Sequence, residues 1–234
     1  MDPITFQYCF NFTDGSEEIF EIRLHRKDLT LIDSSESPLP DWTKLDFYQC
    51  KNCPLNIQTS PHCPLSGSLV SVVNRFERFL SYNETGMKVV TQERIIYQKT
   101  TVQRGVSSML GLIFATSGCP HLAFFKPMAR FHLPLANEEE TIYRATSMYL
   151  LAQYFSKHVG KPVDFELKGL GEIYDNIKVV NAAIAHRLRQ ASKTDSTLNA
   201  IVLLDVYAHT IPYVIKSHME EIQYLFNAFL QTKA

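Results

Sequence analysis

The chain has 234 residues, of which 45% are hydrophobic and 20% charged, so it is long and apolar enough to fold around a buried core. This composition excludes an intrinsically disordered protein, a collagen and a coiled-coil rod. The 23 basic and 24 acidic residues give a formal net charge of −1, so the whole molecule has no basic field with which to hold nucleic acid. We therefore expect no nucleic-acid partner.

Apolar residues that alternate along the chain predict strands in the first hundred residues. Residues 4–12 and 19–24 both alternate, and the turn between them predicts an antiparallel hairpin. Leu29–Ile32 predicts a third short strand, and residues 87–90 and 95–97 predict two more. The residues on the shared apolar face of the first strand are Phe6, Tyr8, Phe10 and Phe12.

Residues 33–66 differ from their surroundings, because five prolines interrupt any regular element and three of the five cysteines lie here. A loop of this length inside a compact domain is unusual unless something else orders it. Helical spacing of apolar residues begins at Ser66 and continues to Leu80, and a second apolar helix is expected over residues 101–115. Residues 120–136 are expected to form another loop.

The remainder of the sequence has helical periodicity. Asn137 is a suitable N-cap for a helix, and three glutamates follow it at the positive end of the helix dipole. A further helix is predicted over residues 170–188, and another begins at Asp195 or Ser196. Pro212 is expected to interrupt that helix, and a last helix is expected over residues 215–229.

The predicted fold class is therefore α+β. A small antiparallel sheet with one helix occupies residues 1–100, and it packs on a bundle of four to five helices over residues 101–234. Because no flexible linker separates these two parts, we expect them to share one core.

The first residues, Met1–Thr5, have neither the basic nor the long apolar segment of a secretory signal. The strongest apolar run, Met109–Ala115, is far shorter than the roughly 20 residues that a membrane-spanning helix needs. We therefore expect a cytoplasmic protein without a membrane span. In that compartment an odd, clustered set of cysteines favours metal ligands or reactive thiols over a disulfide framework.

The cysteines have a spacing suited to a structural zinc site. Cys50 and Cys53 form a C-x-x-C turn that can direct two sulfurs at one tetrahedral ion, and Cys63 is a third candidate ligand. Cys119 is the preferred fourth ligand, because it precedes a proline as Cys53 and Cys63 do. Metal binding would supply the order that the proline-rich loop lacks. Other possible fourth ligands are His62, His121 and His132, and thiols without metal or a redox role remain open alternatives.

The segment from Cys119 to Arg144 concentrates polar chemistry in 26 residues. Cys119, His132 and Glu140 could act as nucleophile, base and orienting group, although a thiol at a helix C-terminus is opposed by the helix dipole. In another interpretation Arg130, His132 and Arg144 bind an anionic small ligand. The third interpretation is a polar network that ties a long loop to the helices.

Several polar residues interrupt the apolar faces of the predicted helices. Asn181 interrupts one apolar stripe, where a buried asparagine usually fixes helix register. Asp205 and His209 lie one turn apart on the next helix and can pair. Arg187 and Arg189 are interpreted as part of a solvated helix end.

Taken together, several segments resemble an uncharacterised bacterial family, a domain of unknown function. The resemblance covers most of the chain and implies no activity. The segments are Cys50-x-x-Cys53-Pro54, Cys63-Pro64, Thr116-Ser117-Gly118-Cys119-Pro120, Arg130-x-His132-Leu133-Pro134 and Glu140-Thr141.

The leading hypothesis is a non-enzymatic cytoplasmic interaction or regulatory module with zinc bound by Cys50, Cys53, Cys63 and Cys119. A thiol-dependent enzyme or redox sensor centred on Cys119 is one alternative, and a sensor of anionic ligands is the other. We expect a protein partner or a homo-oligomer, with the aromatic last helix as a candidate contact surface.

Overall fold

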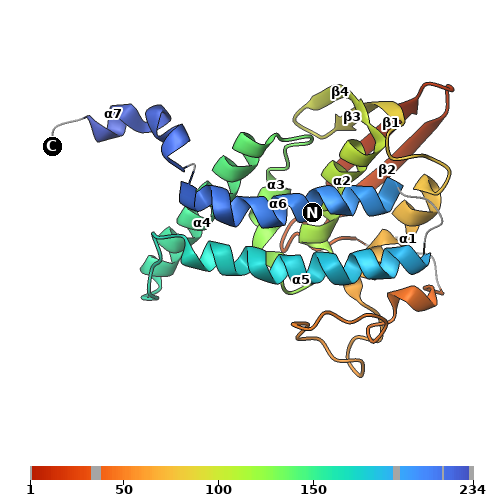
Figure 1. Ribbon diagram of the computed structural model, residues 1–234, viewed down its shortest axis with the longest axis horizontal. Helices are drawn as coiled ribbons and strands as arrows, with labels where there is room; N and C mark the ends of the chain where they lie inside the picture. The colour runs from red at the N-terminus through yellow and green to blue at the C-terminus, as the bar shows by residue number, and fades with distance from the viewer. Residues whose placement is uncertain (1, 33–37, 192–195, 218, 232–234) are drawn as a thin grey trace.

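The computed structural model describes residues 2–32, 38–191, 196–217 and 219–231. It confirms the α+β class, with one four-stranded antiparallel sheet in the order β2-β1-β3-β4 at the N-terminal side and helices after it (Figure 1). The strands are β1 (Ile4–Phe12), β2 (Glu17–Leu24), β3 (Glu84–Val90) and β4 (Ile95–Thr101).

The helices follow the predicted order along the chain. Two short 3₁₀ turns lie in the segments predicted to be loops, and a third lies in the segment predicted to be the last helix. The α-helices are α1 (Pro64–Phe76), α2 (Val102–Thr116), α3 (Lys126–Arg130), α4 (Glu138–His158), α5 (Lys168–Ala191), α6 (Ser196–Ser217) and α7 (Asn227–Leu230), and the 3₁₀ turns are η1 (Asp41–Thr43), η2 (Ala123–Phe125) and η3 (Met219–Phe226).

The β1–β2 hairpin forms as the alternation predicted, and β1 lies between β2 and β3 in the sheet. The face of β1 that was predicted to be apolar is buried, because it packs on α1 and α2. Phe10 meets Phe76 of α1 with ring centroids 5.0 Å apart, and Phe20 of β2 stacks on the same ring at 5.3 Å. These contacts fix the sheet against the first two helices.

Helix α2 lies at the centre of the molecule, between the sheet and the pair α5 and α6. Most of its residues are buried, and its side chains belong to the same hydrophobic cluster as those of β1, α1, α5 and α6. Helices α5 and α6 run side by side along the length of the molecule (Figure 1).

Three predicted elements differ in the structure. Leu29–Ile32 forms only an isolated bridge between Leu24 and Leu31 rather than a strand. The loop over residues 120–136 contains η2 and α3. Helix α6 continues through Pro212, because a proline removes one helical hydrogen bond without preventing its neighbours from staying helical. The last predicted helix is consequently divided between the end of α6, η3 and α7, and Asp195 lies outside the described residues.

The described helices include none that combines the length and the apolar character required to cross a membrane. The predicted N-cap of α4 is confirmed. Asn137 accepts from the backbone N–H of Glu140, and the Glu140 carboxylate accepts from the backbone N–H of Asn137. This reciprocal pair, a capping box, fixes where α4 begins.

Candidate functional site

A cavity of about 370 Å³ lies on the side of α2 that faces α5 and α6. Its lining comes from α2, the segment over residues 122–136, α4, α5 and α6, and most of it is apolar, including Phe114, Phe125 and Leu204. Among the described residues that line it, none is an aspartate or a glutamate, whereas Arg104 and Arg144 both border it. A concave apolar site of this size with a few polar groups is typical of small-molecule binding.

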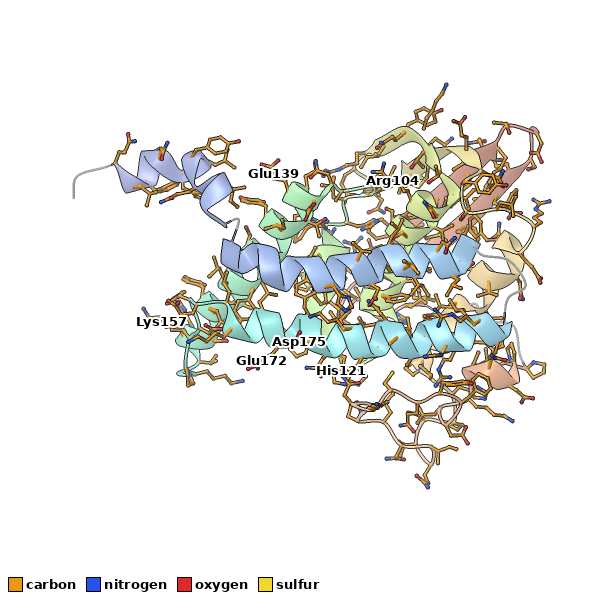
Figure 2. The ribbon with its side chains drawn as sticks, in the orientation of Figure 1. Arg104, His121, Glu139, Lys157, Glu172 and Asp175 are labelled. Carbon is orange, nitrogen blue, oxygen red and sulfur yellow. The ribbon has the colours of Figure 1, made fainter. Side chains whose placement is uncertain are left out.

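Arg144 extends from the first turns of α4 to the cavity. Its Nη2 donates to the backbone oxygen of Met128 at 2.9 Å and to that of Phe131 at 3.1 Å. Within the described part of the chain, no carboxylate lies within 4.0 Å of this guanidinium, and burial lowers its pKa. Arg104 is exposed near the N-terminal end of α2 (Figure 2). The cavity therefore has net positive character.

His132 lines the cavity and is held by the sheet. Its Nε2 is hydrogen-bonded to the hydroxyl of Tyr8, which Ser108 also contacts, and the Ser108 oxygen accepts from the N–H of Leu135 at 2.9 Å. Burial, followed by the charge of Arg144, lowers the pKa of His132 to about 3, so the imidazole is neutral at neutral pH.

The direction of these hydrogen bonds follows from the partners. Burial raises the pKa of Tyr8 well above its ordinary value, so the phenol keeps its proton and can donate it to Nε2 of His132. The imidazole proton then resides on Nδ1. No described group is recorded as a partner of Nδ1, so this nitrogen remains available as a donor.

Asn181 of α5 supplies a second polar group to the cavity. The residue is 1% exposed, and its Nδ2 donates to a carboxylate oxygen of Asp205 at 3.4 Å, which fixes the orientation of the amide. Its Oδ1 is buried without a hydrogen-bond partner in the described structure. A buried acceptor of this kind is costly unless a bound molecule or water donates to it.

The structure does not bring together all the residues of either hypothesis drawn from the sequence, anion binding or thiol catalysis. Arg144 and His132 both line the cavity, whereas Arg130 does not and instead lies over the ring of Phe131 at 5.4 Å. Glu140 caps α4, and Cys119 lies among the other cysteines, so these two residues have different neighbours from His132. Thiol catalysis by Cys119, His132 and Glu140 stays a prediction.

Three segments bring four cysteines together below α5. The C-x-x-C turn closes with a hydrogen bond of 3.0 Å from the N–H of Cys53 to the oxygen of Cys50. Cys63 caps the start of α1, and a Cβ built on Gly118, beside Cys119, would lie 3.6 Å from Cβ of Pro64. This close approach places the start of α1 next to the segment that follows α2.

Residues beyond the cysteines join the same segments. His121 Nε2 is 2.7 Å from the oxygen of Asn52, within the C-x-x-C turn, and Figure 2 shows His121 between α5 and this loop. Asn52 Nδ2 in turn donates to the side-chain oxygen of Asn176 on α5 at 2.8 Å. The loop is thus fixed to both the α2–α3 connection and α5.

Burial changes the ionisation of Cys50 and Cys119. Burial raises the pKa of Cys50 to about 12, and the neighbouring Cys63, Cys53 and Cys119 contribute to this rise. Burial likewise raises the pKa of Cys119 to about 11, so both groups are protonated thiols at neutral pH without a metal. Among the described side chains, no set of three or more His, Cys, Asp or Glu has an arrangement that could hold a metal ion.

Arg187 lies beside this cysteine cluster, which corrects the interpretation of a solvated helix end. The residue is 1% exposed. Its Nη1 donates to the oxygens of Trp42 and Lys44 at 2.9 and 2.7 Å, and Nη2 donates to Leu45 at 2.9 Å. Its Nε is buried without a recorded partner. Arg189, two residues later, is exposed as predicted.

The predicted partner surface at the C-terminus includes exposed apolar side chains among its described residues. Beyond α6 the chain leads to α7, which projects away from the rest of the molecule (Figure 1). Tyr224, Leu225 and Leu230 are exposed there, and Phe229 is 81% exposed. Binding of a partner or of a second copy at this surface stays a prediction.

Sequence reasoning did not identify Tyr8, Ser108 or Arg187 as site residues, and it interpreted Asn181 as a helix-register residue. Tyr8 sits on the apolar face of a strand, where only its hydroxyl distinguishes it from the flanking phenylalanines. Ser108 follows another serine in α2, so its residue type did not distinguish it either.

Comparison with protein-family models gives one match, to a domain of unknown function, DUF6901, over residues 6–227. Neither the comparison with curated proteins nor that with solved structures returned a match. The match extends over both the sheet and the helices, so the cavity and the cysteine cluster lie within the same family domain.

Proposed function

Because the chain belongs to the DUF6901 family, whose description states no activity, we propose a function from its own side chains: the protein binds a small organic anion with an apolar body in the cavity beside α2. The observation that supports this proposal most directly is Arg144. Its guanidinium borders an apolar cavity and has no carboxylate partner among the described residues. The charge of Glu140, one turn earlier on α4, acts on Arg144 without an ion pair within 4.0 Å. A partly desolvated cation that lacks a directly bonded carboxylate favours an anion from solution.

The chemistry of the lining indicates what the ligand contains. Arg144 uses Nη2 for two backbone oxygens, which leaves the N–H groups of its other nitrogens for a carboxylate. His132 is neutral and has a free Nδ1 donor, so it can add a hydrogen bond without adding charge. Phe114, Phe125 and Leu204 suit an aliphatic or aromatic body, and Asn181 Oδ1 can accept from a hydroxyl or amine on it.

The test compares carboxylates with neutral molecules of the same shape. Calorimetric titration and thermal unfolding of the full chain are measured with aromatic carboxylates, medium-chain fatty acids and the corresponding primary amides. We expect at least one carboxylate to bind and raise the unfolding temperature, and its amide to bind about 10- to 100-fold more weakly, because hydrogen bonds to charged groups contribute about 1.5–3 kcal/mol.

Two arginine variants make the test specific to the cavity. Arg144→Met should weaken carboxylate binding by about the same 10- to 100-fold, since it removes the charge but keeps an apolar side chain. Arg130→Met is the matched control, because Arg130 lies outside the cavity lining. Equal affinity for acid and amide, or equal losses in both variants, would contradict the proposal.

A further inference from the structure

We propose that Cys50, Cys53, Cys63 and Cys119 bind one zinc ion as four thiolates, and that Arg187 lies beside the site as its counter-charge and donates its Nε–H to a bound sulfur. This inference concerns the cysteine cluster rather than the cavity, so it is independent of ligand binding there. Zinc sites made of four cysteine thiolates are closed and structural, and they fix the segments that supply the ligands.

The first argument is that cysteines from three separate segments lie near one another. The ligands come from the C-x-x-C turn, the N-terminus of α1 and the end of α2, and contacts between Pro64 and Gly118 and between Asn52 and His121 hold these segments together. The ligands are distant in sequence, since Cys50 and Cys119 are separated by 69 positions.

The second argument is the charge of Arg187. A guanidinium that is 1% exposed needs a counter-ion or a full set of acceptors, and no described carboxylate lies within 4.0 Å of it. Four thiolates on Zn²⁺ have a net charge of −2, so a bound metal would supply the missing counter-charge and an acceptor for the unpartnered Nε–H.

The third argument concerns the fourth ligand, which the sequence left open between Cys119 and three histidines. His62 Nδ1 is 2.7 Å from the hydroxyl of Thr43, His121 Nε2 is 2.7 Å from the oxygen of Asn52, and His132 is held by Tyr8. Cys119 is the candidate that lies near Cys50, Cys53 and Cys63. We therefore assign it as the fourth ligand.

When zinc binds, the metal ion replaces the protons of the thiols. Four thiols lose four protons to solvent, four zinc–sulfur bonds form, and no oxidant or reductant is involved. Because no described set of these side chains already has metal-binding geometry, the sulfurs must move closer to one another when zinc binds.

The primary experiment is elemental analysis of the full chain purified under reducing conditions without added metal. We expect about one zinc per chain, and a thiol reagent should react with four additional cysteines only after a strong chelator is added. Replacement of zinc by Co²⁺ should produce the sulfur-to-cobalt absorption of a tetrathiolate site. These measurements use the native chain and do not depend on a variant that folds.

Alanine variants then assign the ligands. Cys50→Ala, Cys53→Ala, Cys63→Ala and Cys119→Ala should each reduce the bound zinc at least tenfold after dialysis. Cys9→Ala is the matched control, because Cys9 is buried on β1, away from the cluster. Absence of zinc together with no uptake of Zn²⁺ or Co²⁺ by the reduced chain would overturn the proposal, and so would full zinc retention in the Cys119 variant.

Discussion

Arg144 and Arg187 are both largely withdrawn from water, yet their surroundings differ. Arg187 makes hydrogen bonds from both terminal nitrogens to three backbone oxygens of one loop, so most of its donors are satisfied inside the protein. Arg144 uses one nitrogen for two backbone oxygens and is one of the residues that line the cavity. One arginine fixes a loop, and the other remains available to a ligand.

The difference shows that burial of a charged residue does not by itself identify its role. The informative feature is which N–H groups of the arginine are not bonded to backbone oxygens, and what surrounds those groups. For Arg144, no partner of the other nitrogens is found among the described residues, and the side chain borders a space that a small molecule can fill. For Arg187, Nε is buried without a hydrogen-bond partner among the described residues, and the guanidinium lies near Cys63, Cys50 and Cys53. The zinc thiolates proposed above would give this Nε–H an acceptor.

The strongest test of this comparison is the loss of Arg187. Arg187→Met should lower the free energy of unfolding by about 3–5 kcal/mol, because it leaves the oxygens of Trp42, Lys44 and Leu45 without donors. Arg189→Met, at an exposed position of the same helix, should change it by less than about 0.5 kcal/mol. Urea unfolding measures both variants. A similar small change in both would mean that the loop does not depend on Arg187.

A second test uses the pH dependence of His132. Its pKa is about 3 in the folded protein and about 6.5 in the unfolded chain, so between these values the unfolded chain binds one more proton. The free energy of unfolding therefore falls as the pH is lowered below 6.5, by up to about 1.4 kcal/mol per pH unit from this group.

The corresponding variant is His132→Gln, which can still accept from Tyr8 but does not titrate. Between about pH 7.5 and 5 its stability should decline less steeply than that of the unaltered chain, and urea unfolding at several pH values measures the two slopes. Parallel slopes would show that His132 is not held in its neutral form at the cavity.

A third test compares the stability of glycine-to-alanine variants on the two faces of α2. A Cβ added at Gly105 would lie 2.7 Å from Cε1 of Phe10 and 3.2 Å from Sδ of Met87, whereas one at Gly111 meets nothing within 4 Å. Gly105→Ala should therefore cost about 1–3 kcal/mol through overpacking against the sheet. Gly111→Ala, on the cavity side, should stabilise the protein by about 0.5–1 kcal/mol through helix propensity. If urea unfolding showed changes of the same sign in the free energy of unfolding for both variants, the difference in packing between the two faces would be contradicted.

Local patterns predicted the elements of the fold well where a period or a cap is present. The alternation of Phe6, Tyr8 and Phe10 predicted β1 and its buried face, because a strand turns every second side chain to the same side. Asn137 predicted the start of α4 through its cap. Pro212 wrongly predicted a break in the helix. A helix with enough contacts elsewhere can continue although the proline removes one of its hydrogen bonds.

The candidate sites could be predicted only in part. Cys50, Cys53, Cys63 and Cys119 stood out by residue type and spacing, and the structure does bring them near one another. The position of Arg187 could not be predicted, because its partners are up to 145 residues away and its local neighbours suggest solvent. The cavity likewise results from the packing of five segments, and its apolar lining residues look like ordinary core residues in sequence, although His132 and Arg144 were singled out as candidates.

The separation between Arg187 and its loop also constrains how the chain assembles. The oxygens of Trp42, Lys44 and Leu45 receive their donors only after residue 187 has been synthesised, 142 to 145 positions later. At about 5–20 residues per second this delay is about 7–30 s, during which the loop must stay hydrated. Contacts of such long range predict slow folding for the domain, with the loop as one of the last parts to become ordered.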